Sequence, residues 1–268
     1  MIGGDPRTFG MTQNRATQPS PEKIGLPAGI TTLLFDLDGV ITRTAVVHAA
    51  AWKEMFDEFL ADYAQQTGTD QPPFDPRSDY DKYVDGMPRY DGVRSFLESR
   101  SISLPDGEPT DAPAAHTVCG LGNRKNALVV KLIERDGVEA YAGTVDYLAA
   151  AEAHGLRRAV VSSSANCRAI LQSCGLIDDF EEIMDGVVAA ERKIKGKPAP
   201  DTFLAAAQAL GAEPEACTVF EDALAGVEAG RAGGFGFVVG VDRVGQSAAL
   251  IEHGADIAVE DLKELIAP

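Results

Sequence analysis

Two carboxylates stand directly after an apolar run near the start of the chain, in the stretch LLFDLDGVITRT that spans Leu33 to Thr44. The apolar run ends at Asp36, and Asp38 follows two residues later. Such a run, stopped by charged residues, is typical of a buried strand that emerges at one end of a sheet. Residues two apart share a face of a strand, and ligands of open α/β sheets bind at the carboxyl ends of the strands. The spacing therefore predicts two acids placed together where chemistry takes place.

Two simpler explanations of the Asp-x-Asp-Gly pattern have to be weighed. A calcium-binding loop also opens in this way, but it needs an oxygen ligand at its fifth position and an acid at its twelfth. Val40 and Val47 occupy those positions, which excludes such a loop. The other explanation is an ordinary junction between a strand and a turn, and only the rest of the chain can decide it.

Three later stretches carry polar residues at a strand end or a helix start. RRAVVSSSAN places Ser162 after an apolar run, and KGKPAPDTF places Lys197 before a helix that opens with proline. CTVFEDALAG places Glu221 and Asp222 after another apolar run. Each has an ordinary explanation, because serine caps helices, lysine is commonly solvated and acids favour helix N-termini. Their common placement and order argue against coincidence.

Together with Asp36 and Asp38, these stretches resemble the four signatures of the haloacid dehalogenase-like superfamily of phosphoryl-transfer enzymes. The resemblance implies that Asp36 is the nucleophile and Asp38 the general acid and base. It also implies that Ser162 and Lys197 hold the oxygens of the phosphoryl group. A carboxylate that attacks a phosphate dianion needs a bridging cation, and Mg²⁺ prefers oxygen ligands. Its expected ligands are Asp36, the backbone carbonyl of Asp38, Asp222 and the nearby Glu221.

Composition restricts the class of protein. The 268 residues include 45% hydrophobic residues, enough for a full core. A net charge of −17 argues against nucleic acid or an anionic membrane as a partner. There is no apolar run long enough to span a bilayer. The four cysteines form no C-x-x-C pair, so reduced thiols and a cytoplasmic location are expected.

The pattern of elements predicts an α/β fold with a doubly wound parallel sheet and an inserted all-helical cap. Strands and helices alternate from about residue 141 to 259, which indicates a parallel, Rossmann-like sheet. Residues 45–138 show helical spacing without a clear strand and are interpreted as the cap, so that residues 30–44 and 139–268 form the core. Residues 1–29, rich in Gly, Pro, Gln and Thr, are expected to be a disordered leader.

The stretches HAAAWKEMF, DGMPRYDG and NRKNALVVKLI of the expected cap resemble the β-phosphoglucomutase branch of the superfamily. That resemblance implies that Arg89 grips the second phosphate of the substrate, assisted by Lys125 and Asn166. It implies that Thr44 and His48 border the hinge and the acid/base Asp38. The residues expected to bind the substrate are Arg89, Lys125, Asn166, Ser164, Thr44, His48 and Trp52.

Two positions depart from that branch. Arg43 stands where the mutases carry an acid, and Ala165 stands where they carry a lysine beside the asparagine. The second change removes a cation from the distal phosphate site. Arg43 itself, or Arg124 beside Lys125, is a candidate to replace it.

The favoured function is that of a β-phosphoglucomutase, which converts β-glucose 1-phosphate to glucose 6-phosphate through an aspartyl phosphate and a bisphosphate. The expected cofactor is Mg²⁺, with glucose 1,6-bisphosphate as activator, and the protein is expected to be a monomer. The alternative is a Mg²⁺-dependent sugar-phosphate phosphatase, which differs only in passing the phosphoryl group to water. A non-catalytic relative is disfavoured because Asp36, Asp38, Lys197 and Asp222 are all present. The sugar itself is left open.

Overall fold

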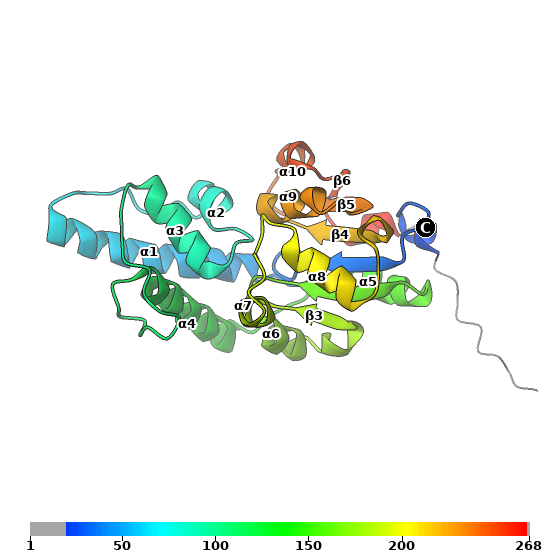
Figure 1. The fold of residues 1–268 in the computed structure, drawn as a ribbon, viewed down its shortest axis with the longest axis horizontal. Helices are drawn as coiled ribbons and strands as arrows, with labels where there is room; N and C mark the ends of the chain where they lie inside the picture. Colours follow the sequence, from blue (N-terminus) through cyan, green and yellow to red (C-terminus); the bar gives the residue numbers. More distant parts are fainter. Residues whose placement is uncertain (1–19, 267–268) are drawn as a thin grey trace, which may run out of the picture.

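The computed structural model describes residues 20–266, which form a parallel sheet covered by helices on both faces and a group of helices beside it (Figure 1). The sheet has the strand order β3-β2-β1-β4-β5-β6, and every neighbouring pair is parallel. The strands are β1 (Thr32–Phe35), β2 (Arg157–Val161), β3 (Glu182–Met184), β4 (Cys217–Glu221), β5 (Phe237–Val241) and β6 (Ile257–Val259). The predicted fold class, an α/β protein with a parallel sheet and a helical region, is confirmed.

Each face of the sheet buries its own apolar layer. Leu33 and Phe35 of β1 pack with Tyr147 on one face, whereas Leu34 between them packs with Phe203 on the other. This is the period-two alternation of a strand that is buried on both sides. The first layer is covered by α5 (Ala142–Ala153) and α6 (Cys167–Ser173). The second is covered by α8 (Asp201–Ala209), α9 (Leu224–Ala232) and α10 (Ser247–His253).

Several short elements connect these layers and were not predicted from the sequence. They include β3, the helix α7 (Gly186–Glu191) that follows it, and α10. Single-turn 3-10 helices lie at η2 (Ile177–Asp179), η3 (Pro214–Ala216) and η4 (Leu262–Leu265). Within residues 20–266, no helix combines the length and the apolar character needed to cross a membrane.

The segment before β1 is ordered from residue 20 onward. It forms the 3-10 helix η1 (Pro21–Ile24), and Ile24 and Leu26 are buried in the same layer as Tyr147. The Tyr147 hydroxyl donates to the backbone carbonyl of Ile24 at 3.1 Å. The prediction of a disordered leader up to residue 29 is therefore wrong for residues 20–29. Its other part, residues 1–19, lies outside the described residues.

Four helices pack beside the sheet around a separate apolar cluster, at the left in Figure 1. Within that cluster, the Phe56 ring centroid lies 5.2 Å from that of Trp52 and 4.0 Å from that of Phe96. Residues 45–138, all of which are described, contain helices and loops but no strand. We call this set the helical group: α1 (Ala45–Thr67), α2 (Ser78–Tyr83), α3 (Arg89–Ser99) and α4 (Val118–Asp136).

The chain passes between the sheet and the helical group in two segments that lie side by side. The Arg43 amide donates to the carbonyl of Glu139, and the Tyr141 amide donates to the carbonyl of Ile41, both at 2.9 Å. Thr42 and Ala140 form an antiparallel bridge between these contacts. The two connections thus run together, next to the end of β1 that carries Asp36 and Asp38.

Candidate active site

The acids and the serine of the sequence signatures meet at the carboxyl edge of the sheet. Asp36 and Ser162 directly follow β1 and β2, while Glu221 ends β4 and Asp222 follows it. Because β1 lies between β2 and β4, these ends are neighbours. All four side chains are buried. The predicted convergence of these residues at one edge is what the sheet order produces.

Lys197 brings a cation to this edge from the loop before α8. Its Nζ donates to Asp36 Oδ1 at 2.5 Å and to the carbonyl of Val161 at 3.1 Å, and it also forms an ion pair with Glu221. Burial lowers the pKa of Lys197, but Asp36 and Glu221 outweigh this effect, so the pKa rises above its ordinary value. Lys197 is therefore a permanent ammonium group at the nucleophile.

The carboxylates outnumber this cation. Oxygens of Asp36, Glu221 and Asp222 lie within 4.8 Å of one another. Burial raises the pKa of Asp36, which Lys197 opposes, and burial together with Asp85 raises the pKa of Asp222. Both shifts show that negative charge at this edge is under-compensated. A set of buried, oxygen-only donors in need of positive charge fits a hard divalent cation such as Mg²⁺.

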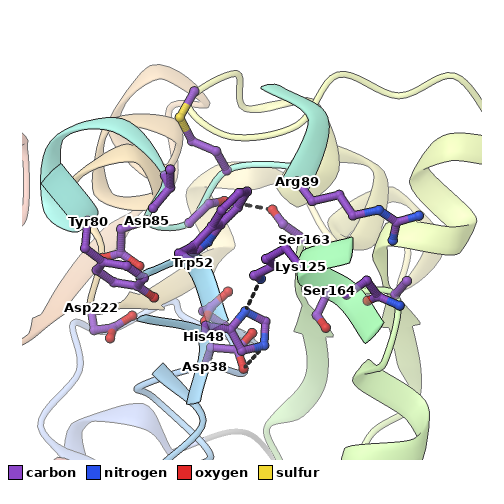
Figure 2. Close-up of a pocket in the computed structure, with 16 residues that line it drawn as sticks. Asp38, His48, Trp52, Tyr80, Asp85, Arg89, Lys125, Ser163, Ser164 and Asp222 are labelled. Carbon is purple, nitrogen blue, oxygen red and sulfur yellow. Dashed lines mark hydrogen bonds and ion pairs between the residues drawn. The ribbon is translucent and has the colours of Figure 1, made fainter. Parts of the chain in front are cut away.

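Asp38 lies at the start of a chain of polar contacts that leads into the helical group. Its Oδ1 accepts a short hydrogen bond from the Thr44 hydroxyl and lies 3.6 Å from His48 Nε2. On the other side of the ring, Lys125 Nζ lies 2.9 Å from His48 Nδ1 (Figure 2). The same ammonium lies 4.7 Å from the Trp52 ring centroid. Four residues predicted to lie at the substrate site thus join Asp38 to α1 and α4.

Burial determines the charge of this polar chain. It lowers the pKa of His48 to about 4, with Lys125 adding to the effect, so the imidazole is neutral at neutral pH. An ammonium can only donate, so while Lys125 is protonated the ring proton belongs on Nε2, which faces Asp38 at 3.6 Å without a hydrogen bond. Burial also lowers the pKa of Lys125 to about 7. Among the residues of this polar chain, from Asp38 to Trp52, Lys125 is the one that titrates near physiological pH.

Arg89 stands at the start of α3, on the helical group. Its Nη2 donates to the Tyr90 hydroxyl at 2.9 Å and to Asn123 Oδ1 at 3.3 Å. Its Nε is buried and has no hydrogen-bond partner among the described residues. An arginine that keeps an unused donor is suited to a phosphate, which accepts several hydrogen bonds at once.

Ser164 and Asn166 lie in the turn between β2 and α6. The Ser164 hydroxyl accepts from the Asn166 amide at 3.1 Å, and the Ser162 hydroxyl accepts from the Ser164 amide at 3.0 Å. The Asn166 side chain donates to Asn126 Oδ1 on α4 at 3.1 Å. Asn166 therefore links the sheet to the helical group in this conformation.

A cleft between the sheet edge and the helical group collects most of the predicted residues (Figure 2). Its free volume is only about 50 Å³, so the cleft is nearly closed. Tyr80, Asp85, Met87 and Asn126 also line it and were not predicted, although Asp85 and Met87 lie in the quoted stretch DGMPRYDG. The predicted residues that line it are Asp36, Asp38, His48, Trp52, Arg89, Lys125, Ser164 and Asp222.

Neither candidate for the missing distal cation lies in the cleft. Arg43 is more than half exposed, and its Nε lies 4.0 Å from the Glu139 carboxylate. Arg124 donates to the carbonyl of Pro113 at 2.9 Å. The suggestion that either one replaces a lysine at position 165 is therefore wrong for this conformation. Ala165 lines the cleft together with Arg89 and Lys125, and it borders a second hollow with Lys195.

The comparisons with known proteins agree with this geometry. The sequence pattern of the haloacid dehalogenase-like hydrolases matches residues 30–234. The chain belongs to the haloacid dehalogenase-like family. Within it, the chain is 55% identical over 246 residues to a β-phosphoglucomutase of Mycobacterium bovis, covering 91% of this chain and 94% of that protein. This haloacid dehalogenase-like chain thus belongs to the β-phosphoglucomutase branch, as its cap stretches suggested.

More distant family members include both activities considered for the chain. A fructose-1-phosphate phosphatase of Escherichia coli is 32% identical over 205 residues, which cover 75% of this chain and 92% of that protein. A β-phosphoglucomutase structure from Clostridium difficile superimposes with a TM-score of 0.67 at 26% identity, covering 88% of this chain and 93% of that one.

Proposed function

We propose that this chain is a β-phosphoglucomutase, which converts β-glucose 1-phosphate to glucose 6-phosphate through an aspartyl phosphate and a sugar bisphosphate. One observation carries the proposal: two separate cations suited to phosphate stand at the nucleophile and on the helical group. Lys197 lies at the nucleophile, while Arg89, with an unused buried donor, lies on the helical group. A bisphosphate uses both cations, one for each phosphate. Hydrolysis of a monophosphate needs only Lys197. The 55% identity to a β-phosphoglucomutase supports the same choice.

In this proposal the helical group, residues 45–138, is a cap domain over a core made of residues 30–44 and 139–268. The paired connections at Thr42 and Ala140 are the place for a hinge, because they are the two segments that join the parts. The cleft, with a free volume of about 50 Å³, leaves little room for a sugar bisphosphate in this conformation. Substrate exchange therefore requires the cap to open, and closure excludes water from the reaction.

Phosphoryl transfer begins with attack of an Asp36 oxygen on phosphorus. The bond from phosphorus to the sugar oxygen breaks, and an acyl phosphate forms on Asp36. Lys197 and the Ser162 hydroxyl hold the equatorial oxygens of the transferred group, where negative charge collects in the transition state. In the second half, the free hydroxyl of a bound sugar monophosphate attacks the acyl phosphate, which forms the sugar bisphosphate and releases Asp36.

Asp38 moves the proton in each half of the reaction. It protonates the departing sugar oxygen in the first half and takes the proton of the attacking hydroxyl in the second. Thr44 donates to the Asp38 carboxylate, and the Nε2–H of His48 faces it. These contacts from residues at the hinge and on α1 hold Asp38 in place while the cap is closed.

Asp36, Glu221, Asp222 and the Asp38 carbonyl are the groups that would hold Mg²⁺ in this site. The ion would supply the positive charge that lets an anionic nucleophile approach a phosphate dianion.

A sugar-phosphate phosphatase is the alternative, and one feature of the cleft favours it. Ala165 lines the cleft where the mutases carry a lysine, and the loss of that cation weakens the hold on a second phosphate. The Escherichia coli relative is a phosphatase at 32% identity. The two functions differ in what accepts the phosphoryl group, a sugar hydroxyl or water.

A paired assay separates these functions. The protein is given Mg²⁺, β-glucose 1-phosphate and a trace of glucose 1,6-bisphosphate, while glucose 6-phosphate and free phosphate are followed together. We expect rapid formation of glucose 6-phosphate with little free phosphate. Release of phosphate without isomerisation would establish the phosphatase instead.

A further inference from the structure

A tightly held loop, residues 242–247, lies beside the carboxylate cluster and has no role in the mechanism above. The loop joins β5 to α10 and is organised by Asp242. One carboxylate oxygen of Asp242 accepts from the amides of Val244, Gly245 and Gln246 at 3.2, 2.7 and 2.8 Å. The other accepts from the amide of Ser247 at 3.0 Å. Four backbone donors on one buried carboxylate fix the shape of the loop.

Two side chains of this loop contact the two segments that carry the acids Asp38 and Asp222. Arg243 Nε donates to the carbonyl of Gly39 at 2.7 Å. Gln246 Nε2 donates to the carbonyl of Asp222 at 3.0 Å. The same loop therefore binds the backbone of Gly39, just after Asp38, and the backbone of Asp222.

The two acidic segments touch each other at the point where the loop holds them. Gly39 has a φ of +87°, and a Cβ at that position would lie 1.6 Å from Asp222 Oδ2. Only glycine fits so close to this carboxylate. The Gly39 amide also donates to the carbonyl of Thr42 at 2.8 Å. A shift of the Gly39 backbone would therefore move it against, or away from, the carboxylate of Asp222.

Arg243 is itself anchored at three points. Its guanidinium carbon lies 3.6 Å from the Tyr141 ring centroid, and its Nη1 donates to the carbonyl of Glu260 at 2.6 Å. The third anchor is the carbonyl of Gly39. A planar guanidinium can stack on a ring and donate to two carbonyls at once, which an ammonium cannot do.

We propose that Arg243 is a positioning residue that sets the spacing between Gly39 and Asp222, and thereby the affinity of the carboxylate cluster for a divalent cation. The inference rests on the proposed function only in taking that cluster as the metal site. Arg243 contacts the Gly39 backbone and is not among the residues that line the cleft. Its effect passes through one hydrogen bond and one close backbone contact.

The test measures Mg²⁺ binding to the full-length protein by titration calorimetry, without substrate, for Arg243→Ala and Arg243→Lys. We expect Arg243→Ala to weaken Mg²⁺ binding by about tenfold or more, as is typical when a group that orients metal ligands is lost. Arg243→Lys should recover part of the affinity, because an ammonium can still hold the Gly39 carbonyl.

Arg231→Ala is the matched control. Arg231 Nε donates to the carbonyl of Gly254 at 3.1 Å, a similar contact on α9 outside the site. We expect its loss to lower the melting temperature while leaving Mg²⁺ affinity unchanged. Unchanged Mg²⁺ affinity in a folded Arg243→Ala variant would overturn the proposal and leave Arg243 a merely structural residue.

A second variant covers the case in which Arg243→Ala does not fold. Gln246→Ala removes the hydrogen bond that holds the Asp222 backbone on the other side of the Gly39–Asp222 contact. The Gln246 side chain is partly exposed, so its loss is less damaging to folding. We expect it to weaken Mg²⁺ binding severalfold, and wild-type affinity in both Gln246→Ala and Arg243→Lys would overturn the proposal. A wild-type protein that binds no Mg²⁺ would overturn the metal site of the proposed function as well, whereas unaffected variants would leave that function standing.

Discussion

At the scale of single residues, the site is governed by what burial does to charged groups. Lys197 keeps its proton because two carboxylates accept from it. Lys125 has no carboxylate within hydrogen-bond distance among the described residues and lies against His48 and Trp52. Burial therefore brings its pKa down to about 7. Lys197 and Lys125 thus differ in how they respond to pH.

This difference predicts a pH dependence of sugar-phosphate binding. A lysine with a lowered pKa is an ammonium group below that pKa and neutral above it, so its attraction for a phosphate is lost as pH rises through about 7. We expect kcat/KM to fall over this range. The second ionisation of a sugar phosphate has a pKa of about 6. A fall in kcat/KM near pH 7 therefore reports a group of the enzyme rather than the substrate.

Lys125→Met provides the control for this profile, because it keeps an apolar stem over Trp52 and removes the charge. Its kcat/KM should be lower than that of the wild type in weakly acidic solution and should lose the decline above neutrality. If the variant retains the same decline, another group causes it.

The sequence predicts the site residues that belong to local patterns and misses those that tertiary packing delivers. Asp36, Ser162 and Asp222 were predicted because each follows an apolar run, which indicates a strand end directly. Tyr80 lies on the six-residue helix α2, for which the sequence shows no periodic pattern, and Asn126 lies in the quoted stretch NRKNALVVKLI but received no role there. Which face of such a helix meets the sheet depends on how the helical group docks, and no local pattern encodes that.

At the scale of elements, the helical group depends on its own aromatic cluster rather than on the sheet. Phe56 is fully buried and lies against the rings of Trp52, Phe74 and Phe96. The helical spacing of Trp52, Met55, Phe56 and Phe59 predicted a helix here, and α1 (Ala45–Thr67) confirms it. The three-residue strand β3 was missed because so short a run shows no usable alternation.

Replacing Phe56 with alanine should cost about 3–5 kcal/mol of unfolding free energy, because a large buried ring is lost and a cavity remains. Urea unfolding followed by tryptophan fluorescence reports on the helical group directly, since Trp52 is the only tryptophan of the chain. The control is Val130→Ala on α4, where 36% of the side chain is exposed. This change should stay within about 0.5 kcal/mol of the wild type, and equal effects of the two would refute the role of the cluster.

At the scale of the whole molecule, the segment before β1 belongs to the core. Its sequence was interpreted as a disordered leader because Gly and Pro are frequent and no periodicity is visible. Ile24 and Leu26 are nevertheless buried in one apolar layer of the sheet, and the carbonyl of Ile24 accepts a hydrogen bond from the Tyr147 hydroxyl. Two apolar residues in a short 3-10 turn are too few to produce a periodic signal, so tertiary contacts alone determine their burial.

Two truncations test this assignment. Removal of residues 1–29 should lower the melting temperature well below that of a protein lacking only residues 1–19, because buried apolar surface and the partner of the Tyr147 hydroxyl are lost. The single change Ile24→Ala should cost about 2–5 kcal/mol by the same loss of burial. Equal melting temperatures of the two truncated proteins would show that residues 20–29 do not stabilise the fold.

The central claim is that Asp36 carries the phosphoryl group and passes it to a sugar rather than to water. The most direct measurement incubates the protein with Mg²⁺ and glucose 1,6-bisphosphate that carries radioactive phosphorus. One portion is digested to map the labelled peptide, and β-glucose 1-phosphate is added to another. We predict label on the peptide that contains Asp36, none in Asp36→Asn, and rapid discharge of the label into sugar bisphosphate. Absence of label at Asp36, or discharge as inorganic phosphate at a rate that the added sugar does not change, would contradict the claim.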